Sequence, residues 1–324
     1  MERVFDVVVA GCGVAGLSAA VAAAERGLKA AVLERASRDD RGGQSRYTEA
    51  YLRMKAIDQV SDDFETYLAE NASVYMDPDL EAEMVQDRAS WSHITRALGV
   101  ADPELIGNFA DNVPGTIAWL QGMGVKFDFL PTQFLTKTQP RLLPVGGGEA
   151  LVEALAARAE SLGVTFFYHT TARELIRDDR GDVQGLLAHN PRDGAVRFKG
   201  KVVLACGGFE GNPALMAKYI GPRSVYLRPV CKGGYFNRGE GIEMALAAGA
   251  APSGEFGSYH AEPVDPRSGV SEPSIFIFPY GILVNNGGRR FTDEAPGTVD
   301  AYYERVTRRI YEQDKGIAYV ILDQ

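Results

Sequence analysis

One short segment near the N-terminus constrains this chain more than any other. Val4–Ala10 is an apolar, valine-rich run typical of a buried parallel strand, and Gly11–Gly16 is a glycine-rich turn. Leu17–Arg26 is alanine-rich and predicts a helix that Gly27 ends, and Ala30–Leu33 predicts a second strand. Strand, turn, helix and strand in this order form the smallest right-handed crossover unit. The sequence therefore predicts an α/β fold.

The turn fits the pattern Gly-x-Gly-x-x-Gly, and Glu34 follows the second strand. In this setting Gly11 allows a tight turn, Gly13 lets a pyrophosphate approach the backbone, and Gly16 lets the helix pack closely on the strand. The free N–H groups at the start of the helix face the phosphates, and Glu34 accepts hydrogen bonds from a ribose. The alternative is a strand-to-helix turn without a ligand. The combination favours a dinucleotide site.

Two further glycine segments indicate which dinucleotide is bound. Gly42–Ser45 suits a loop that lies along the phosphates and ribityl chain of a flavin nucleotide, although a solvent loop is the plainer interpretation. Val202–Phe209 is a buried strand that ends in a glycine pair, although an ordinary strand end has the same pattern. Together with the first motif, these segments favour FAD over NAD.

Composition excludes several classes of protein. The 324 residues are 45% hydrophobic and 24% charged, as in ordinary globular proteins. The net charge of -9 argues against a protein that grips nucleic acid or an anionic membrane. Cys12, Cys206 and Cys231 are far apart and the four histidines are scattered, so we predict no metal site. Without a signal peptide or a run of roughly 20 apolar residues, we expect a soluble, cytoplasmic protein with no direct membrane insertion.

The middle of the chain alternates between helical and strand patterns. Residues 61–124 predict mainly helices, one of which begins at Pro103 and is split by Pro114. Glu149–Leu162 predicts a further helix. Residues 172–205 then read as short strands separated by turns, a meander that leads back into the sheet.

Further motifs extend this pattern along nearly the whole chain. They are Gly146–Gly148, Ala205–Asn212, Gly239–Ala245, Gly281–Asn285 and Gly288–Glu294. With these motifs in this order, the chain resembles the FAD-binding domain of the fumarate reductase and succinate dehydrogenase flavoprotein superfamily. Arg41–Tyr47, the region around His260 and the pair Asp293-Glu294 are most similar to the tricarballylate dehydrogenase branch.

The resemblance implies a Rossmann-like FAD-binding domain of the glutathione-reductase type, with a β-meander, and a smaller α+β capping domain. From about Tyr226 the chain becomes richer in glycine, proline and aromatic residues. We place the first part of the FAD-binding domain in residues 1–231 and the capping, substrate-binding domain in residues 232–324. Members of the superfamily continue with a segment that completes the FAD-binding domain. We expect that C-terminal part to be absent here, either because the sequence is a fragment or because the segment is missing.

The resemblance also implies a function. It predicts an FAD-dependent oxidoreductase that moves a hydride between flavin N5 and a C–C bond of a small polycarboxylate, as in tricarballylate dehydrogenase, with a redox partner that reoxidises the flavin. Ala36 stands where covalent members carry a histidine, so we expect FAD to be bound without a covalent link. The alternatives are a 3-oxosteroid dehydrogenase-like enzyme, a fumarate reductase-like enzyme, and a cofactor-binding module that is inactive alone. NAD-dependent dehydrogenation is a further alternative.

The motifs and the resemblance together predict the site residues. Those that bind the cofactor are Gly11, Gly13, Val14, Ala15, Gly16, Glu34, Arg35, Gly42, Gly43, Gln44, Ser45, Gly147, Gly148, Ala172, Ala205, Gly207, Gly208 and Asn212. For catalysis, His260 would fix a substrate carboxylate, and Arg46 and Arg290 would grip it in bidentate fashion. The plainer alternatives are a loop histidine at His260 and an arginine at Arg290 that anchors the cap turn.

Overall fold

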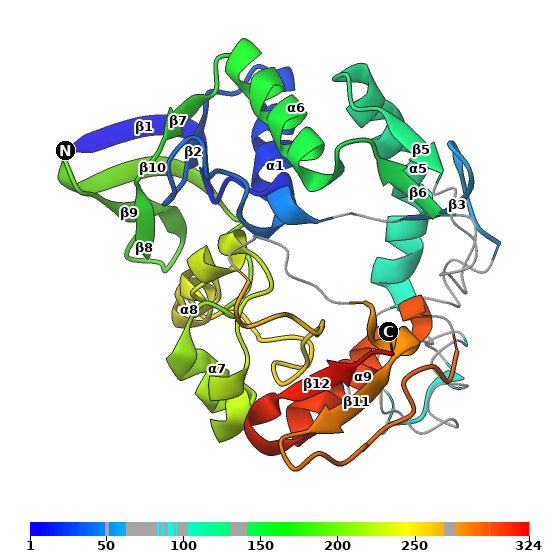
Figure 1. Ribbon diagram of the computed structural model, residues 1–324. Helices are drawn as coiled ribbons and strands as arrows, with labels where there is room; N and C mark the ends of the chain where they lie inside the picture. Colours follow the sequence, from blue (N-terminus) through cyan, green and yellow to red (C-terminus); the bar gives the residue numbers. More distant parts are fainter. Residues whose placement is uncertain are drawn as a thin grey trace.

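A six-stranded sheet organises the N-terminal part of the protein (Figure 1). The computed structural model describes residues 1–48, 52–62, 83, 86, 90–93, 95, 103–129, 141–268, 276–297 and 299–323. The sheet has the order β7-β2-β1-β10-β9-β8. Its strands are β1 (Glu2–Ala10), β2 (Ala30–Leu33), β7 (Thr165–Phe167), β8 (Thr171–Arg177), β9 (Val183–Asn190) and β10 (Gly194–Leu204). The first four in the sheet order are parallel and the last two antiparallel, which confirms the predicted α/β class and the meander.

Helices cover both faces of this sheet. On one face α1 (Val14–Glu25) packs beside α6 (Gly147–Ser161), and the two helices share a fully buried core with Val9, Val32 and Leu155. On the other face, Val8 and Phe198 pack with Met244 of α8 (Glu240–Ala247). The central strands are buried on both faces, which explains why they are continuous apolar runs rather than alternating ones.

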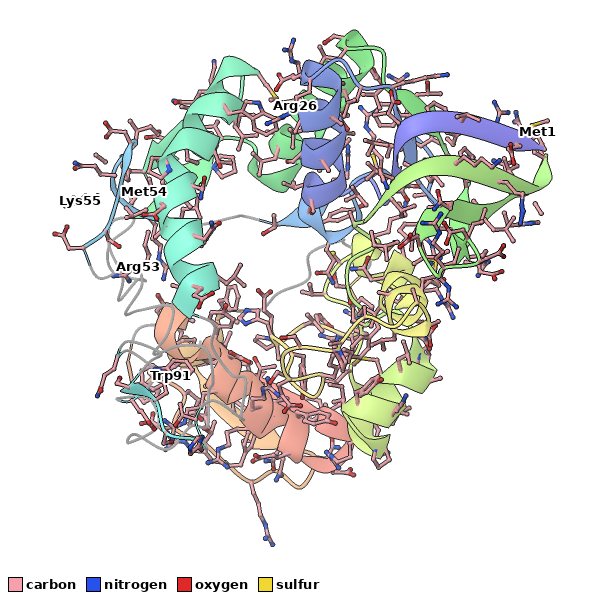
Figure 2. All side chains as sticks on the ribbon, turned by 180° about the vertical axis from the view of Figure 1, so that it is seen from behind. Met1, Arg26, Arg53, Met54, Lys55 and Trp91 are labelled. Carbon is pink, nitrogen blue, oxygen red and sulfur yellow. The ribbon has the colours of Figure 1, made fainter. Side chains whose placement is uncertain are left out.

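A second unit is inserted between β2 and α6. Its antiparallel sheet has the order β4-β3-β6-β5 and is covered by α5 (Pro103–Gly122). The strands are β3 (Leu52–Ala56), β4 (Gln59–Val60), β5 (Phe127–Phe129) and β6 (Arg141–Pro144). In Figure 2 the consecutive residues Arg53, Met54 and Lys55 lie on β3 beside α5. Met54 is fully buried and Lys55 exposed, as the alternation of a half-buried strand requires.

Helix α5 differs from the prediction in one respect. It begins at Pro103 as predicted, but Pro114 does not split it, so that expectation was wrong. Proline removes one helical hydrogen bond and crowds the carbonyl four residues earlier. Val113 and Ile117, on either side of Pro114, are both buried against the small sheet, so packing keeps the two halves of α5 in one continuous helix. Most of the helical prediction over residues 61–102 falls outside the described residues.

The C-terminal part contains a two-stranded sheet. β11 (Ile282–Asn285) pairs with β12 (Ala318–Ile321), and α9 (Val299–Glu312) covers one face around Phe278, Leu283 and Val306. Figure 1 shows this unit across the molecule from the six-stranded sheet, with α7 (Pro213–Tyr219) and α8 between them. Among the described helices, none is long and apolar enough to cross a membrane.

Short 3-10 helices connect these elements. They are η1 (Gly43–Tyr47), η3 (Pro222–Tyr226), η4 (Lys232–Phe236), η5 (Phe278–Tyr280) and η6 (Asp314–Gly316). η4 packs on η1, and α8 packs on β8, so residues 232–247 lie against η1 and the six-stranded sheet. The domain boundary at residue 232 stays a prediction.

Candidate dinucleotide-binding site

A cavity of about 460 Å³ lies where β1, β2 and β10 end, with Ala10, Leu33 and Ala205 in its wall. In open α/β sheets, ligands bind at the carboxyl ends of the strands. The rest of the wall comes from loops that follow these strands and from two later segments. These residues are Gly11, Cys12, Gly13, Ala15, Glu34, Arg35, Gly42, Gly43, Gln44, Ser45, Thr170, Thr171, Ala172, Cys206, Gly207, Gly208, Glu210, Phe236, Asn237 and Glu240.

The first glycine turn brings three segments into close contact. Gly11 has a φ of 110°, and a Cβ on it would lie 2.1 Å from the carbonyl oxygen of Ala205 at the end of β10. A Cβ on Gly16 would lie 2.0 Å from the carbonyl oxygen of Gly11. Both positions therefore exclude any side chain, which is the packing that the glycine motif predicts. Gly13 instead faces the cavity.

The N-terminus of α1 is suited to an anionic ligand. The N-cap residue Gly13 has no side chain that could cap the helix, and the first turn contains no acidic residue. Its Val14 N–H donates to the hydroxyl oxygen of Ser45, 3.2 Å away, so the Gly42–Ser45 loop lies directly over this helix end. Free N–H groups and the positive end of the helix dipole bind phosphate. The glycine backbone at Gly13, where a Cβ would lie 3.2 Å from Ser45 Oγ, therefore fits the diphosphate of a dinucleotide.

Glu34 stabilises the glycine turn by a hydrogen bond to its backbone. The residue is 7% exposed, and its two carboxylate oxygens accept hydrogen bonds from the Cys12 N–H (3.0 Å) and the Ala36 N–H (2.7 Å). Burial raises the pKa of Glu34, and the two backbone donors oppose that rise. Each oxygen keeps a second lone pair, and the residue lines the cavity. Glu34 can therefore accept ribose hydroxyl groups while it holds the turn.

Arg35 connects the end of β2 to the segment from η4 to α8. Its guanidinium donates to the carbonyl oxygen of Phe236 (2.8 Å) and pairs with Glu240 (2.5 Å). Phe236, Asn237 and Glu240 thereby enter the cavity wall, although sequence reasoning did not include them. They lie about two hundred residues from Arg35, and no local pattern indicates the contact.

A second polar group that the sequence analysis missed lies beyond β10. The Gln44 amide donates to Glu210 Oε1, and the Asn237 amide donates to the same oxygen at 2.6 Å. Burial raises the pKa of Glu210. The position of Glu210, three residues after Gly207 in the Ala205–Asn212 motif, was a signal that could have found it.

Most predicted cofactor residues line the cavity, and five do not: Val14, Gly16, Gly147, Gly148 and Asn212. The predicted close approach of Gly148 to the dinucleotide is instead an approach to backbone, because a Cβ there would lie 1.8 Å from the carbonyl oxygen of Ser45. Gly147 likewise lies against the carbonyl oxygen of Thr48. Asn212 caps α7, where its side-chain oxygen accepts hydrogen bonds from two backbone N–H groups.

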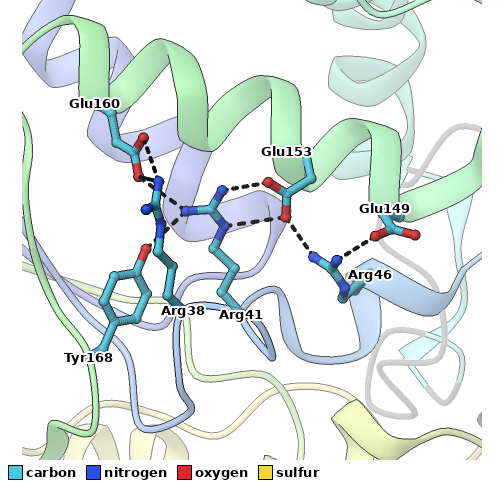
Figure 3. A network of polar contacts seen from close by, with 7 residues as sticks. All are labelled: Arg38, Arg41, Arg46, Glu149, Glu153, Glu160 and Tyr168. Carbon is cyan, nitrogen blue, oxygen red and sulfur yellow. Dashed lines mark hydrogen bonds and ion pairs between the residues drawn. The ribbon is translucent and has the colours of Figure 1, made fainter.

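Arg46 lies outside the cavity wall and in a charged network on α6 (Figure 3). It pairs with Glu149 and, at 2.7 Å, with Glu153. Arg41, whose side chain is 6% exposed, pairs with Glu153 at 2.5 Å and with Glu160 at 3.2 Å. These ion pairs connect the loop that contains Gly42–Ser45 with α6. The structure therefore places Arg46 in a scaffold contact, where its two carboxylate partners already occupy the guanidinium.

The other two predicted catalytic residues lie in the C-terminal part. His260 Nε2 is 2.7 Å from the Tyr303 hydroxyl, and Nδ1 is 3.6 Å from Glu304. The contact with Glu304 raises the pKa of His260. Arg290 pairs at 2.6 Å with Glu294, which also accepts the Leu283 N–H. In the described part of the chain, His260, Arg290 and Arg46 contact different acidic partners and not one another.

Comparison with known proteins agrees with this geometry. Residues 6–323 match the family described as FAD binding domain. The vinyl phenol reductase of Lactiplantibacillus plantarum is 27% identical over 99% of this chain and 62% of its own length. The fumarate reductase (cytochrome) of Shewanella frigidimarina is 26% identical over 98% of this chain and 52% of its own length. The chain thus spans less than two thirds of these relatives.

Solved structures show the same fold. The open conformation of a flavocytochrome c3 fumarate reductase superposes with a TM-score of 0.72 at 20% identity, covering 98% of this chain and 52% of that one. The 3-ketosteroid-Δ4-(5α)-dehydrogenase of Rhodococcus jostii RHA1, in complex with 4-androstene-3,17-dione, gives a TM-score of 0.66 at 25% identity, covering 99% and 67%. The chain belongs to the FAD binding domain family, within the fumarate reductase and succinate dehydrogenase flavoprotein superfamily, and its cofactor is FAD.

Proposed function

We propose that the protein is an FAD-dependent oxidoreductase that transfers a hydride between the flavin and a carbon next to a carbonyl or carboxylate group. The observation that carries this proposal is the cavity at the ends of β1, β2 and β10, where the Gly13 cradle and Glu34 fit FAD. Relatives named vinyl phenol reductase, fumarate reductase and urocanate reductase support the class of reaction.

In this proposal the chain positions the cofactor, and bound FAD supplies the group that accepts or donates the hydride. The amides at the start of α1 hold the diphosphate, and Glu34 holds the adenosine ribose. Ala36 offers no nucleophile where covalent members carry a histidine, so we propose that FAD is released intact on denaturation.

For the substrate we propose a small polycarboxylate, as in tricarballylate dehydrogenase. Relatives named for fumarate and acrylate act on unsaturated carboxylates by name, which supports this choice. Within the chain, the raised pKa of His260 favours an imidazolium that could pair with a carboxylate. Arg46 and Arg290 would need to exchange their present carboxylate partners for the substrate, so we expect His260 to contribute more than either arginine.

A 3-oxosteroid is the second candidate substrate. The Rhodococcus jostii dehydrogenase, whose structure contains a steroid, supports it at 25% identity. A third possibility is a cofactor-binding module that needs further polypeptide for turnover, which is supported by the 52% and 62% of the two relatives that the chain spans.

The test begins with the visible spectrum of purified protein and of the supernatant after boiling. We expect a yellow protein that releases free FAD. Tricarballylate, succinate and 3-oxosteroids are then added without oxygen, and bleaching of the flavin identifies a substrate for oxidation; fumarate, added to chemically reduced enzyme, tests the reverse reaction by return of the colour. Turnover is then measured in a separate assay, in which an artificial electron acceptor takes the place of the redox partner. A colourless protein that takes up no added FAD contradicts the proposal.

A matched pair of variants shows whether FAD is held where we propose. Gly13→Asp places a carboxylate in the phosphate cradle, and we expect it to lose FAD by charge repulsion. Gly115→Asp adds the same charge to an exposed position of α5 with open space around it, and we expect it to retain FAD. Equal FAD content in the two variants would place the diphosphate elsewhere.

A further inference from the structure

The wall of the FAD cavity is polarised between hydrogen-bond donors and acceptors. At the end of β1 it presents the N–H groups that begin α1. Beyond β10 it presents a cluster of three side chains, Gln44, Glu210 and Asn237, which come from three separate segments. The donor side fits the diphosphate, and the second cluster has no part in the function proposed above.

The geometry of this cluster determines how its two amides are turned. A carboxylate is an acceptor only, so the Gln44 and Asn237 amides must point their N–H groups at Glu210 Oε1. Their oxygens then point away from the carboxylate. Asn237 Oδ1 lies beside Gly207, 2.7 Å from where a Cβ on that glycine would be.

The second oxygen of Glu210 is turned toward the cavity wall. Oε2 lies beside Gly208, 2.8 Å from where a Cβ would be, and Gly208 lines the cavity. Among the residues that the structure describes, both side-chain amides donate to Oε1, and the backbone N–H of Glu210 itself is a further donor to the carboxylate, whose four lone pairs are therefore not all used. The cluster therefore offers a carboxylate oxygen to a donor group of the ligand.

Strand order assigns this oxygen to one half of the dinucleotide. In the sheet, β1 lies between β2 and β10. Glu34 follows β2, α1 follows β1 and Glu210 follows β10. A ligand with its ribose at Glu34 and its diphosphate at α1 continues toward Glu210 with its flavin half. That half carries donors that Oε2 can accept, namely the ring N–H and the ribityl hydroxyl groups.

We propose that Glu210 is a positioning residue whose carboxylate, oriented by Gln44 and Asn237, accepts a hydrogen bond from the flavin ring and lowers the reduction potential of bound FAD. Reduced flavin carries more electron density than oxidised flavin, and a nearby negative charge opposes that increase. The cluster thus favours reduction of the substrate, because a flavin of lower potential is less readily reduced and, once reduced, is a stronger hydride donor. This inference rests on the FAD site and on the proposed redox function.

The experiment measures the midpoint potential of the holoenzyme at saturating FAD, by equilibration with a reference dye. Glu210→Gln removes the charge with little change in shape, and we expect the potential to become more positive and the dissociation constant for FAD to rise about tenfold. Glu174→Gln on β8 removes an equal charge from an exposed position and is expected to change neither quantity. Glu210→Asp keeps the charge, so its potential should stay near that of the unmodified protein.

Each outcome decides the proposal. An unchanged or more negative potential in E210Q overturns it, as does an equal shift in E174Q. Loss of affinity without a shift in potential also overturns it, because the carboxylate then contacts the ribityl chain and not the ring. If E210Q does not fold, E210D replaces it: its retracted carboxylate should raise the dissociation constant about tenfold, and an unchanged constant overturns the proposal. Because potentials need no substrate, failure of the substrate panel remains a separate result.

Discussion

The nucleotide-binding sheet and the C-terminal unit around β11, β12 and α9 use charged side chains in opposite ways. In the first, Glu34 and Arg41 are almost fully buried; Glu34 accepts a hydrogen bond from the glycine turn, and Arg41 pairs with α6. In the second, the side chains of His260 and Arg290 are 59% and 57% exposed, although Glu294, the partner of Arg290, is only 5% exposed.

This difference shows which charged side chains are fixed in one arrangement by the fold. A buried charge without its partners costs several kcal/mol, whereas an exposed pair contributes less than about 1 kcal/mol. The contacts around the cofactor cavity therefore cannot be broken without a large cost in free energy. The predicted substrate groups form pairs that a ligand could replace.

The largest expected effect tests the close packing at the cavity. Gly16→Ala places a methyl group against the carbonyl oxygen of Gly11, and we expect it to destabilise the protein by about 3 kcal/mol or more. Gly115→Ala, in an exposed part of α5 with open space, should instead stabilise by about 0.5–1 kcal/mol. Thermal melting of both variants is the measurement. Similar melting temperatures would show that the glycine turn is not tightly packed.

Next in size is the contrast between two arginines of one network. Arg41→Met removes a buried guanidinium that contacts Glu153, Glu160 and Tyr168 together, and we expect a loss of about 2 kcal/mol. Arg38 shares Glu160 but its side chain is 62% exposed, so Arg38→Met should cost less than about 1 kcal/mol. Unfolding by urea compares them. Equal costs would remove burial as the reason for the difference.

A third change concerns cofactor affinity. Glu34→Gln replaces one acceptor oxygen by an N–H group that faces a backbone donor, and we expect about a tenfold weaker FAD complex. Titration of apoprotein with FAD, followed by flavin fluorescence, measures it. Glu174→Gln is again the control, and the idea that Glu34 serves the adenosine ribose is lost if both variants bind FAD equally.

The smallest effect is expected at His260. Its pKa is raised above the ordinary 6.5 by the contact with Glu304, so the stabilisation is complete below pH 6.5 and disappears as pH rises through the folded-state value. Because the side chain is more than half exposed, we expect it to contribute less than about 1 kcal/mol. His260→Gln should flatten the dependence of the melting temperature on pH in this window, and His189→Gln, at an exposed position of β9, is the control. A cost larger than that of Arg41→Met would break the comparison.

Several structural features were predictable because they depend on local chemistry. The glycine turn, the two strands around it, Glu34 and the meander all follow from residue types at fixed spacing. Three features could not be predicted, because each depends on which part of the fold packs nearby. They are the continuity of α5 through Pro114, the helix cap formed by Asn212 and the ion pairs of Arg46 with α6. The contacts of Glu210 with Gln44 and Asn237 join segments separated by up to 166 residues.

The sequence by itself determined that the chain forms a crossover unit with a dinucleotide-binding turn. The reason is that a carbonyl oxygen packs where a side chain would be at Gly11 and Gly16, so only glycine fits there. Only the tertiary structure decided which glycines face the cavity and which bring backbones together, as Gly13 and Gly148 show. It also decided which charged side chains are free to bind a substrate. Arg46 follows a predicted cofactor loop in the sequence, but in the fold it is paired with Glu149 and Glu153 of α6.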